Sequence, residues 1–472
     1  MDVRLLLAML AIGAATSVPS IPQGSIEDFV AHELPASGAP GLAYAVVTDG
    51  EITTVQGYGV VEQGGDTEVT ADTPFLTGSI SKGFTALAVM QLVEAGEVDL
   101  DTGISHYLDD FSRQPAGTVT VRQLLSHTSG YSTLQGNSSY TDVSGGDDEL
   151  ARRVEGLAAQ GPAHGPGERW EYSNANYLIL GRLVEVMGGR SYQDYVTDHI
   201  LKPIGMEHSF VADGKSHDTM ATGHTPWFGT KRPIRDSPPG RGMAPAGGIV
   251  ASAGDLALYL QMMMNGEDDV VTATDKAQML RPAGTGSRHY GFGWFLDPET
   301  ATAWHDGSTP GFEALATMAP DRRSGVVVLV NAGSGMGFGE TIGLRNGITA
   351  RALGLDYGGE GSPLPRQVLF LGVVLLPIVY LLSMVWAWRH RRQIRAKSGV
   401  AGLFSLWFPL LTTTVAAWVM LVLVPRLFGA PLSTIRLFQP DFGLALIASG
   451  VGGVLWAVFR LAVAYAGRSE ST

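Results

Sequence analysis

Hydrophobic residues follow two different patterns along this chain, and the change comes near residue 360. Before that point, apolar positions recur with the short periods of strands and amphipathic helices. After it come three long runs with almost no charge, at 368–388, 399–424 and 442–466. Because a helix rises ~1.5 Å per residue, each run is long enough to cross a membrane core of ~30 Å. We therefore predict three transmembrane helices, with three buried core helices as the alternative.

Within the first 357 residues, strand patterns surround a helical middle. Apolar runs at 41–47 and 52–61 enclose Asp49-Gly50, which predicts a hairpin. Helical spacing is found at 81–95, 174–186 and 253–264, and strand-like runs return at 302–305, 313–318 and 325–331. This order predicts an α+β fold with two lobes: an antiparallel sheet flanked by helices and built from both ends of the domain, and an all-helical lobe.

The composition narrows the classes of function. Among 472 residues there is no cysteine, which excludes thiol catalysis, disulfides and cysteine metal sites. Residues 1–359 carry 42 acidic and 22 basic residues, whereas residues 360–472 carry 3 acidic and 10 basic residues. An acidic body argues against binding to nucleic acid, and a basic, apolar tail indicates a lipid bilayer as partner.

The two ends of the chain predict its topology. One arginine, a short apolar run and small residues predict a signal peptide over 1–20, with an uncleaved anchor or a buried helix as the alternative. The segment 389–398, between the first two spans, holds five Arg or Lys, and the positive-inside rule places it in the cytoplasm. We therefore expect a multi-pass protein of the cell membrane, with an extracytoplasmic domain at 21–357 and a linker at 358–367.

A candidate catalytic pair lies at the start of the helix predicted over 81–95. Ser79 and Lys82 form the only Ser-x-x-Lys in the chain. Residues three apart share a helix face, so the hydroxyl and the amine can touch. A partly buried lysine loses its charge readily and can take the proton of a serine, which makes the serine a strong nucleophile. A serine and a lysine on a solvated helix face is the alternative.

Two further motifs follow in order. Tyr172-Ser173-Asn174 is the only Tyr-x-Asn in the chain, and His305-Asp306-Gly307 is one of two His-x-Gly triplets. With these motifs the chain resembles the serine beta-lactamase and penicillin-binding-protein superfamily, in its class C-like branch of serine hydrolases, from Ile26 to Leu353. The resemblance also includes the segments Thr120–Gly130, Pro166–Asn174, Pro203–Met206, Pro245–Ile249 and Tyr290–Trp294.

The resemblance implies catalytic roles for three residues. Ser79 is expected to be the nucleophile that forms an acyl-enzyme, and either Lys82 or Tyr172 is expected to take its proton. Tyr172 is also expected to activate the water that deacylates the enzyme. That role requires a neighbouring cation such as Lys82 to lower the pKa of the phenol. A core aromatic residue is the alternative for Tyr172.

Other residues are expected to bind the substrate. The amide of Asn174 would hold Lys82 and the substrate together, with a helix N-cap as the alternative. The backbone amides of Ser79 and Ser308 form the expected oxyanion hole, and Gly307 would let substrate approach the strand closely. No metal and no cofactor is implied, because the acid pairs at 109–110 and 147–148 are typical of solvated loops. His127 is expected to be structural.

His305 and Asp306 depart from the pattern of the superfamily. Many relatives have a lysine at the position of His305; a neutral imidazole can orient Tyr172 but supplies less positive charge. Lactamases and carboxypeptidases usually have a hydroxyl residue at the position of Asp306. If Asp306 faces the cleft, it repels a substrate carboxylate at ~4 Å by about 4 kcal/mol at an effective dielectric constant of ~20. A side chain that points out of the cleft is the alternative.

Together these features predict a membrane-tethered, extracytoplasmic serine hydrolase that cleaves an ester or amide through an acyl-Ser79 intermediate. A small-molecule or peptide substrate, including cell-envelope material, fits that location. A true beta-lactamase or D,D-carboxypeptidase is the first alternative, and His305 and Asp306 count against it. A catalytically silent binding or sensor module is the alternative from another class. The complete set of catalytic residue types counts against that alternative.

Overall fold

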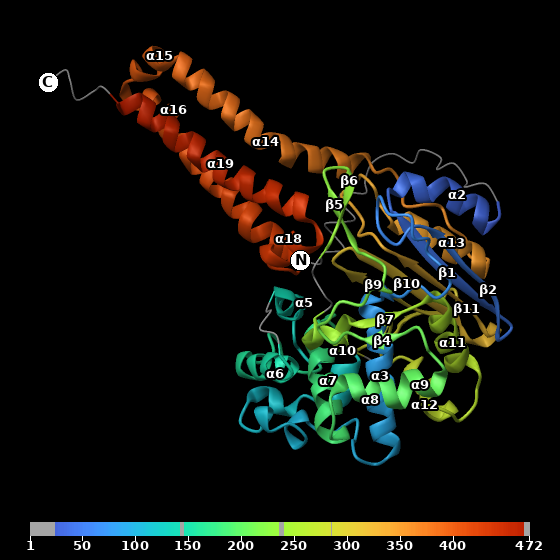
Figure 1. The fold of residues 1–472 in the computed structure, drawn as a ribbon. Coiled ribbons are helices and arrows are strands. Elements are labelled where there is room, and N and C mark those ends of the chain that lie inside the picture. Colours follow the sequence, from blue (N-terminus) through green and yellow to red (C-terminus); the bar gives the residue numbers. More distant parts are fainter. Residues whose placement is uncertain (1–23, 142–145, 236–239, 285, 467–472) are drawn as a thin grey trace. The chain divides into compact units, whose positions relative to one another are not determined.

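The computed structural model describes residues 24–141, 146–235, 240–284 and 286–466. The predicted signal peptide at 1–20 lies outside the described residues. Those described divide into two units (Figure 1). One unit extends to Gly361 and omits Met336–Phe338, and the other combines Met336–Phe338 with the residues from Ser362 onward.

The first unit contains a six-stranded antiparallel sheet with the order β2-β1-β11-β10-β9-β8. Its strands are β1 (Gly41–Thr48), β2 (Glu51–Gly59), β8 (Phe295–Asp297), β9 (Thr302–Thr309), β10 (Phe312–Ala319) and β11 (Ser324–Val330). Strand β1 pairs with β11 on one side and with the edge strand β2 on the other, so the prediction of a sheet built from both ends of the domain is confirmed. Strand β9 continues to Thr309, beyond the predicted end at 305, because it pairs with β10 over its whole second half.

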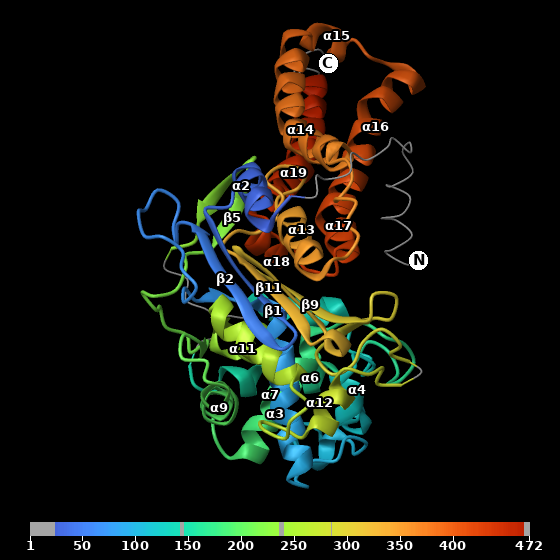
Figure 2. The ribbon, with the colours of Figure 1, turned by 90° about the vertical axis from the view of Figure 1, so that its right-hand side faces the viewer.

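Both faces of this sheet are covered (Figure 2). On β1, Leu42, Tyr44 and Val46 belong to one buried cluster, and Ala43, Ala45 and Val47 belong to another. The alternation follows from the period of two in a strand, which turns successive side chains to opposite faces. Helices α2 (Ile26–Ser37) and α13 (Ile342–Leu353) pack on the first face, and α11 (Ala253–Met264) packs on the second.

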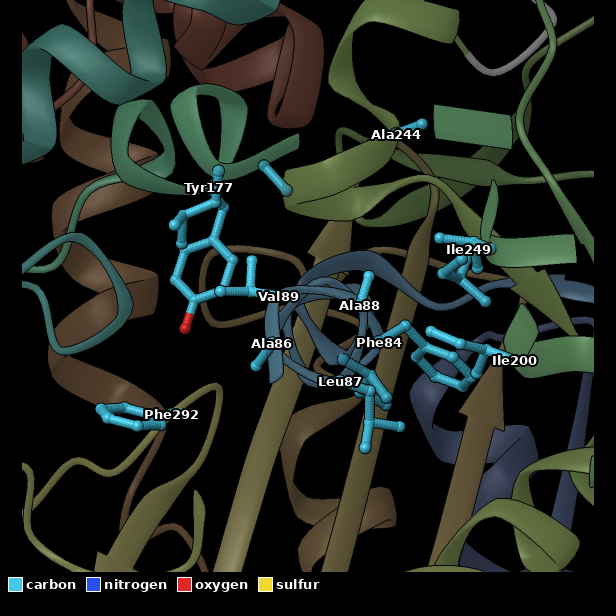
Figure 3. Close-up of a cluster of buried hydrophobic side chains, with 14 of the residues drawn as sticks. Phe84, Ala86, Leu87, Ala88, Val89, Tyr177, Ile200, Ala244, Ile249 and Phe292 are labelled. Atoms are coloured by element: carbon cyan, nitrogen blue, oxygen red, sulfur yellow. The ribbon is translucent and has the colours of Figure 1, made fainter. Parts of the chain in front are cut away.

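The second lobe of this unit is organised around helix α3 (Ser81–Glu94), which is buried on nearly all sides (Figure 3). A helix that is apolar all round belongs in the interior of a domain. It packs against α7 (Asn174–Gly188) and α10 (Ala244–Gly247). Among the described residues, the other α-helices of four or more residues in this lobe are α4 (Val121–Leu125), α5 (Thr133–Ser138), α6 (Glu149–Gln160), α8 (Tyr192–Val196) and α12 (Ala273–Met279).

Short strands accompany these helices. A three-stranded sheet has the order β3-β7-β4, with β3 at Phe75–Leu76, β7 at Ile249–Ala251 and β4 at Phe210–Val211. A separate hairpin joins β5 (His224–Trp227) and β6 (Thr230–Pro233). The predicted helical lobe therefore includes a small sheet, and β3 delivers the chain directly to Ser79.

The second unit holds three helices that are long and apolar enough to cross a membrane, at Leu364–Arg389, Gly399–Leu427 and Pro440–Tyr465. They overlap the three predicted spans. Helix α19 (Pro440–Tyr465) packs against both α14 (Leu364–Arg389) and α16 (Gly399–Trp418). A short helix, α15 (Arg391–Arg395), lies in the basic segment between the first two spans.

Candidate active site

Ser79 and Lys82 lie where a short 3₁₀ turn meets helix α3. Ser79 is the middle residue of the turn Gly78–Ile80, and Lys82 is the second residue of α3. Lys82 is fully buried, and its Nζ lies 2.9 Å from Ser79 Oγ. The same Nζ is 2.8 Å from Asn174 Oδ1 and 2.7 Å from the carbonyl oxygen of Ala246. The two residues are therefore in direct contact, and the alternative of a solvated pair is excluded.

The surroundings of Lys82 favour a neutral amine. Burial holds the pKa of its amine well below the usual value, and the nearby Asp306 carboxylate only partly offsets this effect. A neutral amine has two N–H groups and one lone pair. The carbonyl oxygens of Asn174 and Ala246 can accept both N–H groups. The lone pair is then available to the Ser79 hydroxyl, which is the arrangement that a general base requires.

Asn174 reaches Lys82 from the start of helix α7. Ser173, and not Asn174, holds the N-cap position of this helix, so the N-cap alternative for Asn174 is wrong. The Asn174 side chain donates from Nδ2 to Asn137 Oδ1 at 3.0 Å while its Oδ1 accepts from Lys82. Asn137 in α5 thus fixes the orientation of the amide, a contact that the sequence did not indicate.

Tyr172 lies beside the pair. Lys82 Nζ is 4.9 Å from the centroid of the Tyr172 ring. Burial raises the pKa of the Tyr172 phenol well above 10, and a hydrogen bond with Ser79 acts in the opposite direction. The expected lowering of this pKa by Lys82 is not found, because burial disfavours the charged form of both groups. Tyr172 therefore keeps its proton and is suited to donate a hydrogen bond.

His127 packs against Tyr172 and binds the residues that follow it, as expected for a structural role. Its side chain is buried and its φ is +60°, an uncommon conformation for a residue other than glycine. His127 Nδ1 accepts hydrogen bonds from Ser173 N at 3.1 Å and Asn176 Nδ2 at 2.9 Å. Its ring lies 4.4 Å from that of Tyr172, between centroids. Burial also holds the pKa of His127 well below its usual value, so the imidazole stays neutral.

His305 forms a hydrogen bond with Tyr290, a residue to which the sequence gave no role. Its Nδ1 donates to the carbonyl oxygen of Asp306 at 2.6 Å, and its Nε2 accepts from the hydroxyl of Tyr290 at 3.2 Å. Burial lowers the pKa of His305 to about 4, so the imidazole is neutral at neutral pH. The rings of His305 and Tyr172 are 6.0 Å apart between centroids, and the hydrogen bond at Nε2 joins His305 to Tyr290 instead. The sequence offered one indication of a role for Tyr290, because it begins the segment Tyr290–Trp294 that resembles the superfamily.

Asp306 lies on the opposite face of β9 from His305 and is half-exposed, with 42% of its side chain accessible. Its Oδ2 is 3.8 Å from Nη2 of Arg345 in helix α13. The Asp306 carboxylate raises the pKa of both Lys82 and Tyr172, so its charge is felt at the catalytic pair. The Asp306 side chain therefore matches neither alternative fully. It points to the opposite face of β9 from His305, but its charge still acts on the catalytic pair.

Gly307 and Ser308 bring strand β9 against the turn that carries Ser79. A Cβ built on Gly307 would lie 1.9 Å from the carbonyl oxygen of Thr77, and one on Gly78 would lie 2.7 Å from the backbone nitrogen of Ser308. The absence of a side chain at 307 therefore allows a close approach of β9 to Thr77, and the approach of a substrate to this strand stays a prediction. The same approach places the backbone amide of Ser308 beside the residue that precedes Ser79, as an oxyanion hole requires.

The acid pairs form ordinary ion pairs or surface turns. Asp147 pairs with Arg241 and Asp148 with Arg152. Asp109 and Asp110 lie exposed at the start of a 3₁₀ turn. Within the described part of the chain, no group of three or more His, Cys, Asp or Glu side chains is arranged to hold a metal ion.

Comparison with known proteins assigns the family. The family model for Beta-lactamase matches residues 26–347, which is more than half of the chain. The chain belongs to the beta-lactamase family. Penicillin-binding protein 4 of Amycolatopsis lactamdurans is 33% identical to it over 324 residues, 63% of this chain and 82% of that protein.

Two further similarities agree with this family. Protein flp of Staphylococcus aureus strain MW2 is 26% identical over 66% of this chain, which spans only 64% of that protein's length. In strain MRSA252 the match extends over 425 residues, 86% of this chain and 83% of Protein flp, at 25% identity. The structure of an octameric penicillin-binding protein homologue from Pyrococcus abyssi superimposes with a TM-score of 0.62 at 27% identity, over 75% of this chain and 82% of that one. The beta-lactamase family and its neighbours are serine hydrolases that act through an acyl-serine.

Proposed function

We propose that this protein is a membrane-tethered, extracytoplasmic hydrolase that cleaves an ester or amide through an acyl-Ser79 intermediate. The observation that carries the proposal is the position of Lys82 Nζ, 2.9 Å from Ser79 Oγ and bound to two neutral carbonyl oxygens. This geometry gives a weak nucleophile a base that is uncharged before the reaction begins. Three long apolar helices at the C-terminus support the membrane tether.

Acylation begins when Ser79 Oγ attacks the carbonyl carbon of the substrate and its proton passes to Lys82 Nζ. The backbone amides of Ser79 and Ser308 receive the negative charge that develops on the carbonyl oxygen. The bond from carbon to the leaving oxygen or nitrogen then breaks, and the leaving group takes a proton from the Tyr172 phenol or the Lys82 ammonium. Tyr172 suits this role because burial keeps its hydroxyl protonated.

Deacylation reverses the roles with water as the nucleophile. If Tyr172 has protonated the leaving group, it takes a proton back from the Lys82 ammonium, so Lys82 is neutral again on either route. A water molecule then attacks the acyl carbon and gives its proton to Lys82. The bond from the acyl carbon to Ser79 Oγ breaks, and Ser79 regains its proton from the Lys82 ammonium, 2.9 Å away. The hydrogen bond from Tyr290 to His305 holds the motif His305-Asp306-Gly307 in place during both steps.

The location of the substrate follows from the proposed topology. The segment 389–398 carries five Arg or Lys between two candidate spans, which favours the cytoplasmic side for this segment. The catalytic unit is then outside the membrane, where peptides and esters of the cell envelope are within reach. No metal or cofactor is needed for the steps above.

A fluorophosphonate probe tests the nucleophile directly, because it phosphonylates activated serines. We expect the purified full-length protein to be labelled, and Ser79→Ala to lose the label. Ser112→Ala, which changes an exposed serine of a surface turn, serves as the matched control and should be labelled like the wild type. Failure to label the wild type, or equal labelling of Ser79→Ala, would remove the proposed chemistry.

The similarity to proteins named for penicillin binding favours a second candidate function, the recognition of penicillin itself. Asp306 counts against it, because its carboxylate would repel the carboxylate of a penicillin. A fluorescent penicillin distinguishes the two functions. Stable labelling at Ser79 would support the second candidate, and fluorophosphonate labelling without penicillin labelling would support the first.

A further inference from the structure

A charged network lies behind the strand that borders the proposed oxyanion hole. Asp306 and Ser308 extend from the same face of β9, two residues apart. Glu313 is paired with Ser308 on β10 and accepts a hydrogen bond from Ser308 Oγ at 3.1 Å. Arg345 in α13 connects the two acids, with Nη1 3.3 Å from Glu313 Oε2 and Nη2 3.8 Å from Asp306 Oδ2.

Arg345 is held firmly in this position. Its side chain is only 9% exposed, and Nη1 also donates to the carbonyl oxygen of Ala314 at 2.8 Å. A guanidinium fixed beside a substrate-binding strand is the group that proteins use to recognise carboxylates, because its planar fork matches two carboxylate oxygens. In this protein Nη2 of that guanidinium already faces a carboxylate of the chain itself, that of Asp306 at 3.8 Å.

We infer that Asp306 occupies, on Arg345, the place that a carboxylate of a substrate would take, so that the site selects esters and amides whose leaving group is neutral or cationic. This inference rests on the proposed acyl-Ser79 chemistry and names the substrate class of that site. It also assigns Arg345 as a residue that determines specificity, in a helix that the sequence pattern did not reveal.

The position of Asp306 gives it this influence. Its side chain is 42% exposed, whereas Arg345 behind it is 9% exposed, so an entering carboxylate meets the acid before the base. The two carboxylates of Asp306 and Glu313 face a single guanidinium, so the network offers no excess positive charge to an anion. The effect of Asp306 on the pKa of Lys82 and Tyr172 shows that its field reaches the reacting groups.

The test compares two thioesters that differ by one charge. N-benzoylglycyl thioglycolate carries a carboxylate on its leaving group, and its methyl ester is neutral. The released thiol is measured with a thiol reagent, for which the chain gives no background because it has no cysteine. In the full-length protein we expect kcat/KM to be at least about tenfold higher for the neutral substrate, given the strength of charge repulsion at close range.

Two variants then separate the acid from the base. Asp306→Asn should raise the ratio of kcat/KM for the charged over the neutral substrate by about tenfold or more, because Arg345 is freed for the substrate carboxylate. Adding Arg345→Met to Asp306→Asn should abolish most of that gain. Asp321→Asn, which removes an exposed acid at the far end of β10, is the matched control and should leave the ratio unchanged.

The outcomes are distinct. An unchanged ratio in Asp306→Asn, or a gain that survives the loss of Arg345, overturns the inference while activity on the neutral thioester still supports the proposed function. A binding measurement removes the dependence on turnover and on the folding of the double variant. Calorimetry with thioglycolate, the charged leaving group itself, should show binding to Asp306→Asn at least about fivefold tighter than to the wild type, and equal affinity would contradict the inference.

Discussion

The environment of Lys82 differs from that of another buried lysine in the same unit, and the difference explains its proposed chemistry. Lys276 lies 2.5 Å from the carboxylate of Asp269, so its positive charge is compensated. Lys82 makes its three hydrogen bonds to a hydroxyl and two carbonyl oxygens, all of them uncharged. Burial without a counter-ion in contact favours the neutral amine. Lys276 is therefore suited to hold a loop, whereas Lys82 is suited to accept a proton.

The first prediction concerns the pH dependence of acylation. Because only the neutral amine can act as base and burial lowers the pKa of Lys82, the rate should reach its plateau well below pH 10 and fall as the pH decreases through that lowered pKa. The measurement is the rate of fluorophosphonate labelling between pH 4 and 10. A rate that still rises steeply near pH 10 would show that Lys82 is charged in the resting protein. Lys202→Arg changes an exposed lysine and serves as the control.

The second prediction uses Asn174 to change the charge state of Lys82. Asn174→Asp places a carboxylate where Oδ1 now lies 2.8 Å from Nζ, which should raise the pKa of Lys82. At pH 7 labelling should slow by about 10- to 100-fold, and raising the pH should restore it. Asn174→Ala removes the same hydrogen bond without adding charge. It should slow labelling without moving the pH dependence upward, and equal profiles for the two variants would contradict the proposed role of Lys82.

Two elements that are distant in sequence create the site by approaching more closely than side chains allow. The turn Gly78–Ile80 and strand β9 meet at Gly78 and Gly307, where the absence of Cβ atoms lets the two backbones touch. Thr77, which precedes this turn, is also held to strand β7, because its Oγ1 donates to the carbonyl oxygen of Ile249 at 2.8 Å. The proposed oxyanion hole thus depends on a packing of backbones, which gives a physical reason for the glycine at the end of His305-Asp306-Gly307.

The third prediction tests this packing. In Gly307→Ala the new methyl group would lie 1.9 Å from the carbonyl oxygen of Thr77, so β9 must move away from the turn. We expect a loss of about 2 kcal/mol or more in unfolding free energy and a marked loss of labelling at Ser79. Gly156→Ala adds the same methyl group inside helix α6 where no atom lies within 4 Å. This control should be stabilised by about 0.5–1 kcal/mol, and a similarly mild effect at Gly307 would contradict the backbone contact.

The elements that the sequence predicted well are those whose signal is local. Helix 253–264 and the hairpin at Asp49-Gly50 follow from periodicity and turn chemistry, and the structure has α11 at Ala253–Met264 and Gly50 at φ +86°. Helices α2 and α13 were not predicted. Both helices are stabilised by packing on a face of the sheet whose strands lie far away in the sequence, so no local pattern reveals them. In α13, glycines and charged residues also interrupt the apolar positions.

At the site, the sequence predicted the residues that carry motifs and missed those that support them. The Ser79–Lys82 contact follows from helix geometry, and Asn174 follows from its triplet. The sequence did not assign Arg345, Asn137 and Tyr290, because their roles arise from contacts with residues 15 to 39 positions away in the chain. The charge states of Lys82 and Tyr172 likewise depend on burial, which no local pattern specifies.

At the scale of the whole molecule, the distribution of charge is the main argument for orientation. Residues 1–359 carry an excess of acids, and the excess of bases after residue 360 is concentrated between the first two candidate spans. In the segment 389–398, Arg389, Arg392 and Arg395 are exposed beside the exposed indole rings of Trp386 and Trp388. Tryptophan and arginine side by side are typical of the membrane–water interface. This pattern supports a cytoplasmic basic segment and an odd number of crossings between it and the catalytic unit.

The fourth prediction tests that topology with single cysteines, which is possible because the wild-type chain has none and serves as its own blank. Asp321→Cys in the catalytic unit and Ser433→Cys between the second and third spans should react with a membrane-impermeant maleimide in intact cells. Ser398→Cys in the basic segment should react only after the membrane is permeabilised, because the positive-inside rule keeps that segment in the cytoplasm. All three positions are exposed side chains, so a difference in labelling reports the side of the membrane and not burial. Labelling of Ser398→Cys in intact cells, with protection of Asp321→Cys, would reverse the proposed orientation and place the catalytic serine in the cytoplasm.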